Sequence, residues 1–371
     1  MSPTNIVKVG PAYQQTESLL MRLPQELRIM IYAFLFSSTR SISGKKCSYK
    51  SVVYRFRSAT HGLAILSSCR KAYVEVGQSW VGNVLFCFKT PRAMLDKLGD
   101  IPLETRSMIR HVRVSGCYID VRCKDNWKRY GIYQVLKLLP GLKLDILTVC
   151  GSDNVQTCYD TLDRLVKYSD GWKELHYKSH NSGFLGFYPA WFNDLDEYDG
   201  ENGFFREPQP GAWQRKLEDR DGLNSGASVT VYRSDNPRRD YSTPYISGAG
   251  MWIKFTQVLA PNQDIEEYQK ANDAQFKTRW EMEKEVLVVV KRGRGVDYKE
   301  RQGSSYLETG DIREEFPGKT WAEIKASKDE IRSINRRGFS HNDNRTKAKH
   351  VDVMDDYTHA DDYVWLSIHL F

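Results

Sequence analysis

Three short apolar segments, RHVRV (110–114), LDILTV (144–149) and WKELHY (172–177), alternate with two longer patterns, IYQVLKLL (132–139) and DTLDRLVKY (160–168). The short segments have the length and composition of strands, whereas apolar residues in the longer ones recur with the spacing of a helix. Strands joined by helices of about a dozen residues are most simply parallel, with right-handed crossovers. This βαβαβ order predicts a domain of the α/β class.

The segments LLPGLKLDIL (138–147) and DGWKELHY (170–177) also look like irregular leucine-rich-repeat units. Their spacing of roughly 30 residues lies at or beyond the usual 20 to 29, and no Asn or Cys ladder recurs. We therefore expect strand-helix units of irregular, repeat-like character.

Further strands are expected downstream at SVTVY (228–232) and at EVLVVVK (285–291), whose unbroken apolar run suggests a strand covered on both faces. Thr320 and Glu323 form a capping box at the start of TWAEIKASKDEIRSI (320–334), which we expect to be one helix. The expected apolar face of this helix consists of Trp321, Ile324, Ile331 and Ile334.

Residues 181–250 contain nine Gly and five Pro and predict long irregular loops. Loops held on a rigid scaffold often carry the binding surface of a protein. The candidate substrate-binding residues in this region are Trp191, Phe192, Trp213 and Tyr232. The alternative is that these aromatic side chains pack the loops down onto the domain.

The apolar residues of LPQELRIMIYAFLF (23–36) recur at helical spacing and predict an amphipathic helix. They are Leu23, Leu27, Met30, Ile31, Phe34 and Leu35. Pro24 suits the first helical position, because its missing N–H forfeits no hydrogen bond there. Such side chains each gain about 1.5–3 kcal/mol on burial and therefore need a surface to dock on.

A second apolar helical pattern, LAILSSCRKAYVEV (63–76), offers that surface within the chain, and a partner protein is the alternative. Arg70 and Glu75 are expected on its solvated face, where ion pairs contribute little. The strand-like VLFCF (84–88) follows.

The motifs LPxELR (23–28) and CRxxYxE (69–75), with the aromatic strand residues Phe86 and Phe88, resemble the F-box-like proteins that are numerous in filamentous fungi. The WKEL segment, and a KRG turn (291–293) before a Thr-Trp helix, extend the resemblance over most of the chain. It implies a helical module that docks on the Skp1 adaptor of a cullin-type ubiquitin ligase, while the rest recruits an unknown substrate protein. The docking residues would be Leu23, Pro24, Leu27, Ile31 and Leu35.

The expected architecture is therefore mixed, α+β or α/β. A flexible segment (1–18) precedes an F-box-like helical module (19–90) that contains a basic insertion (37–62). An α/β recognition domain (91–371) follows, with the loop-rich region inside it.

Composition excludes several classes of protein. The longest apolar runs fall well short of the roughly 18 residues needed to cross a bilayer, so we expect no membrane partner. The N-terminus lacks the pattern of a signal peptide, and seven cysteines without a C-x-x-C pair suit a reducing compartment. We expect an intracellular protein, cytoplasmic or nuclear. Cys117, Cys123 and His111 are better read as inert core residues than as zinc ligands.

No catalytic motif is recognisable: the chain lacks G-x-S-x-G, H-E-x-x-H, the phosphate-binding G-x-x-x-x-G-K and a helix-opening G-x-G-x-x-G. The acidic VDVMDDYTHADDY (351–363) lacks the spacing of a calcium loop and follows a basic run that would neutralise it. A nuclease site using Glu285 and Lys291 does not have the usual acid-x-Lys spacing. We therefore expect no enzyme, no cofactor and no metal.

Nucleic-acid binding is the alternative function. The segment RSISGKKCSYKSVVYRFR (40–57) holds six cations and no acid, with aromatic residues between them, and the net charge of the chain is +7. Such a segment can combine phosphate contacts with base stacking. The candidate contacts are Lys45, Lys46, Arg55 and Arg57.

Overall fold

The architecture follows from a computed structural model of the chain. It describes residues 18–43, 62–68, 70–123, 126–151, 155–185, 210–237, 255–259, 284–296, 298, 311–327 and 331–334.

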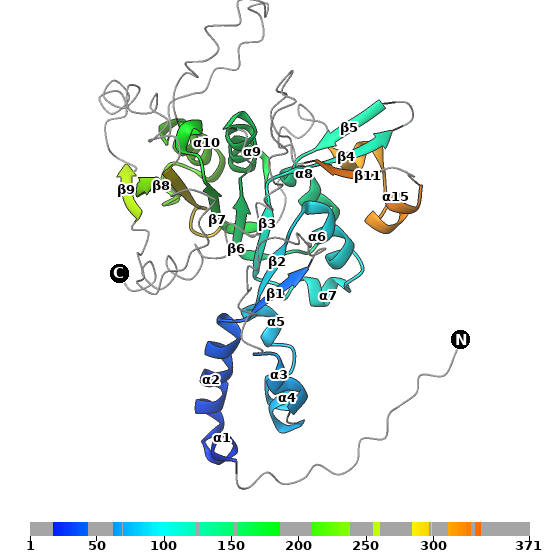
Figure 1. Cartoon of the computed structure of the whole chain (residues 1–371), viewed down its shortest axis with the longest axis vertical. Helices are drawn as coiled ribbons and strands as arrows, with labels where there is room; N and C mark the ends of the chain where they lie inside the picture. Colours follow the sequence, from blue (N-terminus) through cyan, green and yellow to red (C-terminus); the bar gives the residue numbers. More distant parts are fainter. Residues whose placement is uncertain are drawn as a thin grey trace, which may run out of the picture.

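An eight-stranded sheet organises the molecule, with strand order β1-β2-β3-β6-β7-β10-β8-β9 (Figure 1). Its members are β1 (Arg40–Ser43), β2 (Leu85–Phe88), β3 (His111–Ser115), β6 (Leu144–Cys150), β7 (Trp172–Ser179), β10 (Lys284–Lys291), β8 (Ser228–Pro237) and β9 (Phe255–Leu259). The mixed α/β class expected from the sequence is therefore confirmed.

The first five strands of this order are parallel to one another. Between β3 and β6 lie the strands β4 (Tyr118–Cys123) and β5 (Asn126–Tyr130), followed by α8 (Ile132–Val135) and the 3-10 helix η1 (Leu136–Leu138), and α9 (Val155–Tyr168) connects β6 to β7. The parallel pairing of the three predicted strands is thus confirmed, but their first connection contains two strands that were not predicted, and its helical segment is shorter than expected and ends in a 3-10 turn.

The remaining strands are antiparallel: β10 pairs with both β7 and β8, and β8 pairs with β9. The predicted run from Val286 to Val290 lies in β10 and is buried throughout. A central strand with neighbours on both edges and apolar side chains on both faces explains this unbroken pattern.

The main core lies against one face of the sheet. Val112, Leu147 and Leu175 are in register across the parallel strands β3, β6 and β7 and belong to one cluster of buried side chains. The same cluster takes in residues from α6 (Pro91–Leu98), α9 and α10 (Gly211–Asp221). Alternate residues of a strand point to opposite faces, so the neighbouring polar residues Arg113, Thr148 and His176 face the other way.

A second, three-stranded antiparallel sheet has the order β11-β4-β5 and is formed by β4 (Tyr118–Cys123), β5 (Asn126–Tyr130) and β11 (Ile331–Ile334). β11 corrects the sequence prediction. Ile331 and Ile334 were expected on a helix, but they pair with Val121 and Tyr118 of β4. The edge of β4 that is not paired with β5 supplies backbone hydrogen-bond partners for these residues, and a four-residue apolar pattern in the sequence does not reveal those partners.

Residues next to two helix starts specify them locally. Thr90 caps α6 by accepting a hydrogen bond from the amide of Ala93, with Pro91 in the first turn. The Glu323 carboxylate accepts hydrogen bonds from the amide and the hydroxyl of Thr320, which completes the predicted capping box of α15 (Trp321–Ser327). The short α7 (Leu103–Arg106), η2 (Ser182–Leu185) and α14 (Ile312–Glu315) complete the connections of the α/β body.

A small helical module projects from one end of the sheet, at the bottom of Figure 1. It consists of α1 (Leu19–Arg22), α2 (Gln25–Ser37), α3 (Ala64–Ser68) and α4 (Arg70–Val76), with α5 (Trp80–Asn83) at the junction. β1 and β2, from the expected N-terminal module, form the edge of the large sheet, so module and body share one sheet. No described helix is both long and apolar enough to traverse a lipid bilayer.

A candidate docking surface on helix α2

Helix α2 buries the face opposite to that expected from its apolar pattern. The side chains of Arg28, Tyr32 and Phe36, spaced at four-residue intervals, are the buried ones on α2. Tyr32 and Phe36 form a small separate core with Ala72 and Val76 of α4. The second apolar pattern is thus the intramolecular mate of α2, but it meets a different face of the helix.

The predicted apolar stripe points outward instead. Phe34 is 76% exposed, Met30 67%, Leu27 46% and Ile31 41%. Leu23 and Leu35 are half-buried, while Pro24 is exposed and lies at the N-cap of α2, one position before that predicted. The interpretation in which the apolar stripe is buried within its own module is therefore wrong for Leu27, Met30, Ile31 and Phe34.

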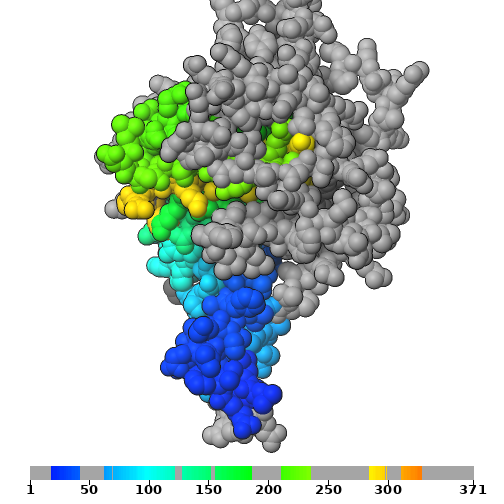
Figure 2. All heavy atoms as spheres, turned by 90° about the vertical axis from the view of Figure 1, so that its left-hand side faces the viewer, coloured from blue at the N-terminus to red at the C-terminus, as the bar shows by residue number. Residues whose placement is uncertain are grey.

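Figure 2 shows the blue N-terminal helices at the lower end of the molecule, with α2 turned toward the viewer. Burying these four side chains would stabilise the fold by about 1.5–3 kcal/mol each, and the chain by itself does not gain this stabilisation. Scattered exposed apolar residues are ordinary, but a contiguous apolar patch on one helix face marks an interaction surface.

A buried ion pair joins α2 to α4. The guanidinium of Arg28 donates from Nε to Glu75 Oε2 at 2.9 Å and from Nη2 to Oε1. Its Nη1 donates to the backbone carbonyl of Leu23. Only 6% and 9% of the two side chains remain exposed. Glu75 was expected on a solvated helix face, and the structure corrects this.

The Glu75 carboxyl is held in its charged form by this contact. Hydrogen bonds from Arg28 outweigh the effect of burial and lower the pKa of Glu75 below its ordinary value. The Tyr32 hydroxyl lies 3.5 Å from the same carboxylate. The pair sits in a thin helical layer with little protein around it, so solvent screens part of its attraction.

The predicted substrate-binding loop residues fare differently. Trp213 is a core residue of α10, fully buried, whose Nε1 donates to Asp163 of α9 at 3.1 Å. Tyr232 is half-buried on β8, opposite Leu287. Neither lies on a loop, because the sequence from 210 to 237 forms a helix and a strand. Trp191 and Phe192 lie outside the described residues.

The basic residues Lys45, Lys46, Arg55 and Arg57, residues 1–17 of the N-terminal segment and the acidic run 351–363 also lie outside the described residues. Glu285 pairs with His180 near one end of β10, and Lys291 with Glu174 at the other. Six strand residues span about 20 Å, so the two groups do not share a nuclease site. Among the described residues, no three His, Cys, Asp or Glu side chains are grouped to hold a metal ion.

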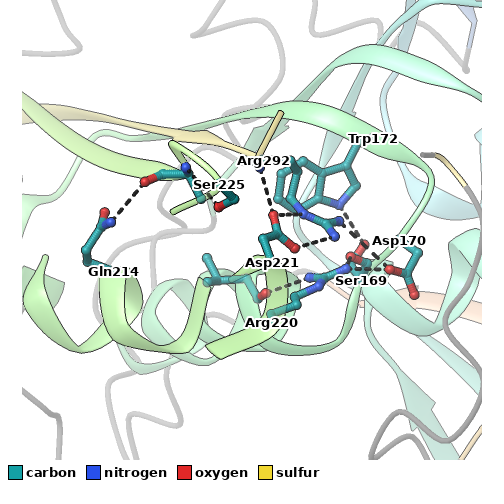
Figure 3. A network of polar contacts seen from close by, with 11 residues as sticks. Ser169, Asp170, Trp172, Gln214, Arg220, Asp221, Ser225 and Arg292 are labelled. Carbon is teal, nitrogen blue, oxygen red and sulfur yellow. Dashed lines mark hydrogen bonds and ion pairs between the residues drawn. The ribbon is translucent and has the colours of Figure 1, made fainter. Parts of the chain in front are cut away.

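A polar network ties the antiparallel strands to the parallel half of the sheet (Figure 3). Arg292 donates from Nε and Nη2 to the Asp221 carboxylate at 2.7 and 2.8 Å, and its guanidinium carbon lies 5.4 Å from the centre of a Trp172 ring. Arg220 pairs with Asp170 beside it. The WKEL segment and the KRG turn, far apart in sequence, therefore meet at one buried junction.

A row of polar side chains crosses the sheet on the face opposite the main core. Arg113, Thr148 and His176 are in register on β3, β6 and β7, and each is at most 2% exposed. Burial lowers the pKa of His176, although its contact with Glu174 opposes this. The period-two alternation of each predicted strand indicates that these residues face away from the main core, but their alignment into a row depends on the register between strands.

No family model, curated protein or solved structure matches the chain. Function must therefore be argued from the outward face of α2 and the arrangement around it.

Proposed function

We propose that this protein is a non-catalytic adaptor whose helical module docks a Skp1-like partner through the outward face of α2. The α/β body would then recruit a substrate protein for a cullin-type ubiquitin ligase. The observation that carries the proposal is the exposure of Leu27, Met30, Ile31 and Phe34 on a helix that already has an intramolecular mate. The small core between α2 and α4 does not include the side chains of this face.

The position of the module supports the same function. The helices α1 to α4 project from the end of the sheet, so a partner can reach α2 without displacing the body (Figure 1). Apolar side chains from one helix face, at spacings of three and four residues, are the anchors with which helices bind apolar grooves. A docking site of this kind needs no catalytic group.

The test is co-purification of the full chain with Skp1. Leu27→Asp with Ile31→Asp places two carboxylates on the outward face and should abolish the association. The matched control is Leu103→Asp with Leu223→Asp, since these leucines of the body are 57% and 79% exposed. The control should retain Skp1 at the wild-type level. A wild-type chain that retains no Skp1 contradicts the proposal.

A further inference from the structure

The rotation of α2 about its own axis is not the one that apolar burial alone would select. The face turned toward α4 carries Arg28 in its line, while the more apolar face with Leu27, Ile31 and Phe34 is left in solvent. The hydrophobic effect depends only on the apolar area removed from water, so by itself it would favour the rotation that buries Leu27, Ile31 and Phe34 against α4. Something directional must hold the helix as it is.

The Arg28–Glu75 contact supplies that direction. The guanidinium reaches both carboxylate oxygens of Glu75 and also the carbonyl of Leu23, in the turn that leads into α2. These bonds fix α2 relative to α4 and to the preceding chain at once. Rolling α2 would strip Glu75 of its cation and leave a covered carboxylate unpaired, which proteins strongly disfavour.

We propose that Arg28 and Glu75 are positioning residues, whose pairing sets the rotation of α2 and keeps its apolar face available to a partner. The inference rests on the proposed function for the partner's identity, but the rotation itself can be measured in the chain alone. A pair with this role trades apolar burial for a unique arrangement of two helices.

The decisive variant is Arg28→Leu with Glu75→Leu, which replaces the ion pair by apolar side chains and removes the demand on rotation. Hydroxyl-radical oxidation, read by mass spectrometry at Met30 and Phe34, reports the exposure of the outward face. We expect oxidation at both residues to fall several-fold, at unchanged or increased resistance to urea, together with several-fold weaker binding of purified Skp1. Resistance to urea would then stay the same or rise while Skp1 binding weakens, and a purely structural role does not produce this combination.

Two controls keep the result interpretable. Arg28→Lys keeps a cation that can donate to the Glu75 carboxylate and to the Leu23 carbonyl, and should keep Met30 and Phe34 oxidation near the wild-type level. Lys128→Leu with Glu315→Leu removes a half-exposed pair between β5 and α14 and should change neither the oxidation of Met30 and Phe34 nor the binding of Skp1.

Unchanged oxidation at Met30 and Phe34 in a folded double-leucine variant overturns the positioning role. If that variant unfolds the module instead, Arg28→Lys decides: oxidation of Met30 and Phe34 near the wild-type level supports the role, and a shift away from that level overturns it. A wild-type chain that ignores Skp1, while oxidation of the double-leucine variant still falls, contradicts the proposed function and leaves the positioning role supported.

Discussion

At the scale of single residues, buried charged pairs decide arrangements that apolar patterns leave open. Arg28 and Glu75 lie 47 positions apart in sequence, and Asp221 and Arg292 lie 71 apart. Helical periodicity predicted that α2 has an apolar stripe, but not that the line of Arg28, Tyr32 and Phe36 on the same helix would be the buried one. Pairings at such separations leave no local signal, so this part of the candidate site could not be predicted.

Asp221→Asn tests the junction at Trp172. The substitution keeps the shape of the side chain but leaves the buried Arg292 without its bidentate partner, which should cost about 3 kcal/mol of the free energy of unfolding. Urea unfolding measures the loss. Asp219→Asn, on the exposed side of the same helix, is the control and should change stability by less than about 0.5 kcal/mol. Equal effects of the two substitutions would argue against the junction.

Hydrogen bonds from Arg28 lower the pKa of Glu75 in the folded chain, so Glu75 releases its proton more readily there than in the unfolded chain. Its contribution is therefore complete above the unfolded value of about 4.3 and is lost as pH falls through the lowered folded pKa. The protection factors of the α2 amides, which compare the measured exchange rate with the intrinsic rate at the same pH, should fall over this acid range in the wild type. In Glu75→Gln, these protection factors should already be lower at neutral pH and should change less with acid.

At the scale of elements, the sequence predicted where helices begin better than where they end. The caps at Thr90 and Thr320 use neighbours three residues away, so they are readable from sequence, and the predicted capping box at Thr320 is found as expected. The end of α15 is not so marked. The helix stops at Ser327, and Ile331–Ile334 become a strand because β4 offers an unpaired edge, which is a tertiary fact.

Thr320→Ala should destabilise α15 by about 1 kcal/mol, because the first turn loses the hydroxyl of its capping box. The measurement is hydrogen exchange of the α15 amides. Lys319→Ala, an exposed residue immediately before the cap, should leave exchange unchanged. An equal acceleration in both variants would remove the capping interaction from the account.

At the scale of the whole molecule, the parallel order of β3, β6 and β7 was predictable because alternating strands and helices in one sheet permit few topologies. The position of β1 was not, since β1 lies within the expected basic insertion (37–62) and pairs with β2, which follows the helical module in the sequence. The polar row through His176 also emerges only when strands are brought into register.

Burial lowers the pKa of His176, so the folded chain holds this imidazole neutral where the unfolded chain would protonate it. The contribution to stability is complete above the unfolded value of about 6.5 and is lost as pH falls from there toward the folded pKa. His176→Gln should flatten the dependence of the urea midpoint on pH between about 6.5 and 5. A variant with the wild-type slope would show that other groups govern it.

The outward face of α2 is the central claim, and footprinting of the full chain with and without purified Skp1 tests it most directly. We predict that Skp1 protects Leu27, Met30, Ile31 and Phe34 from hydroxyl-radical oxidation, while Leu103 and Leu223 on the body keep their exposure. Oxidation of the four α2 residues that does not change at saturating Skp1 would contradict the account.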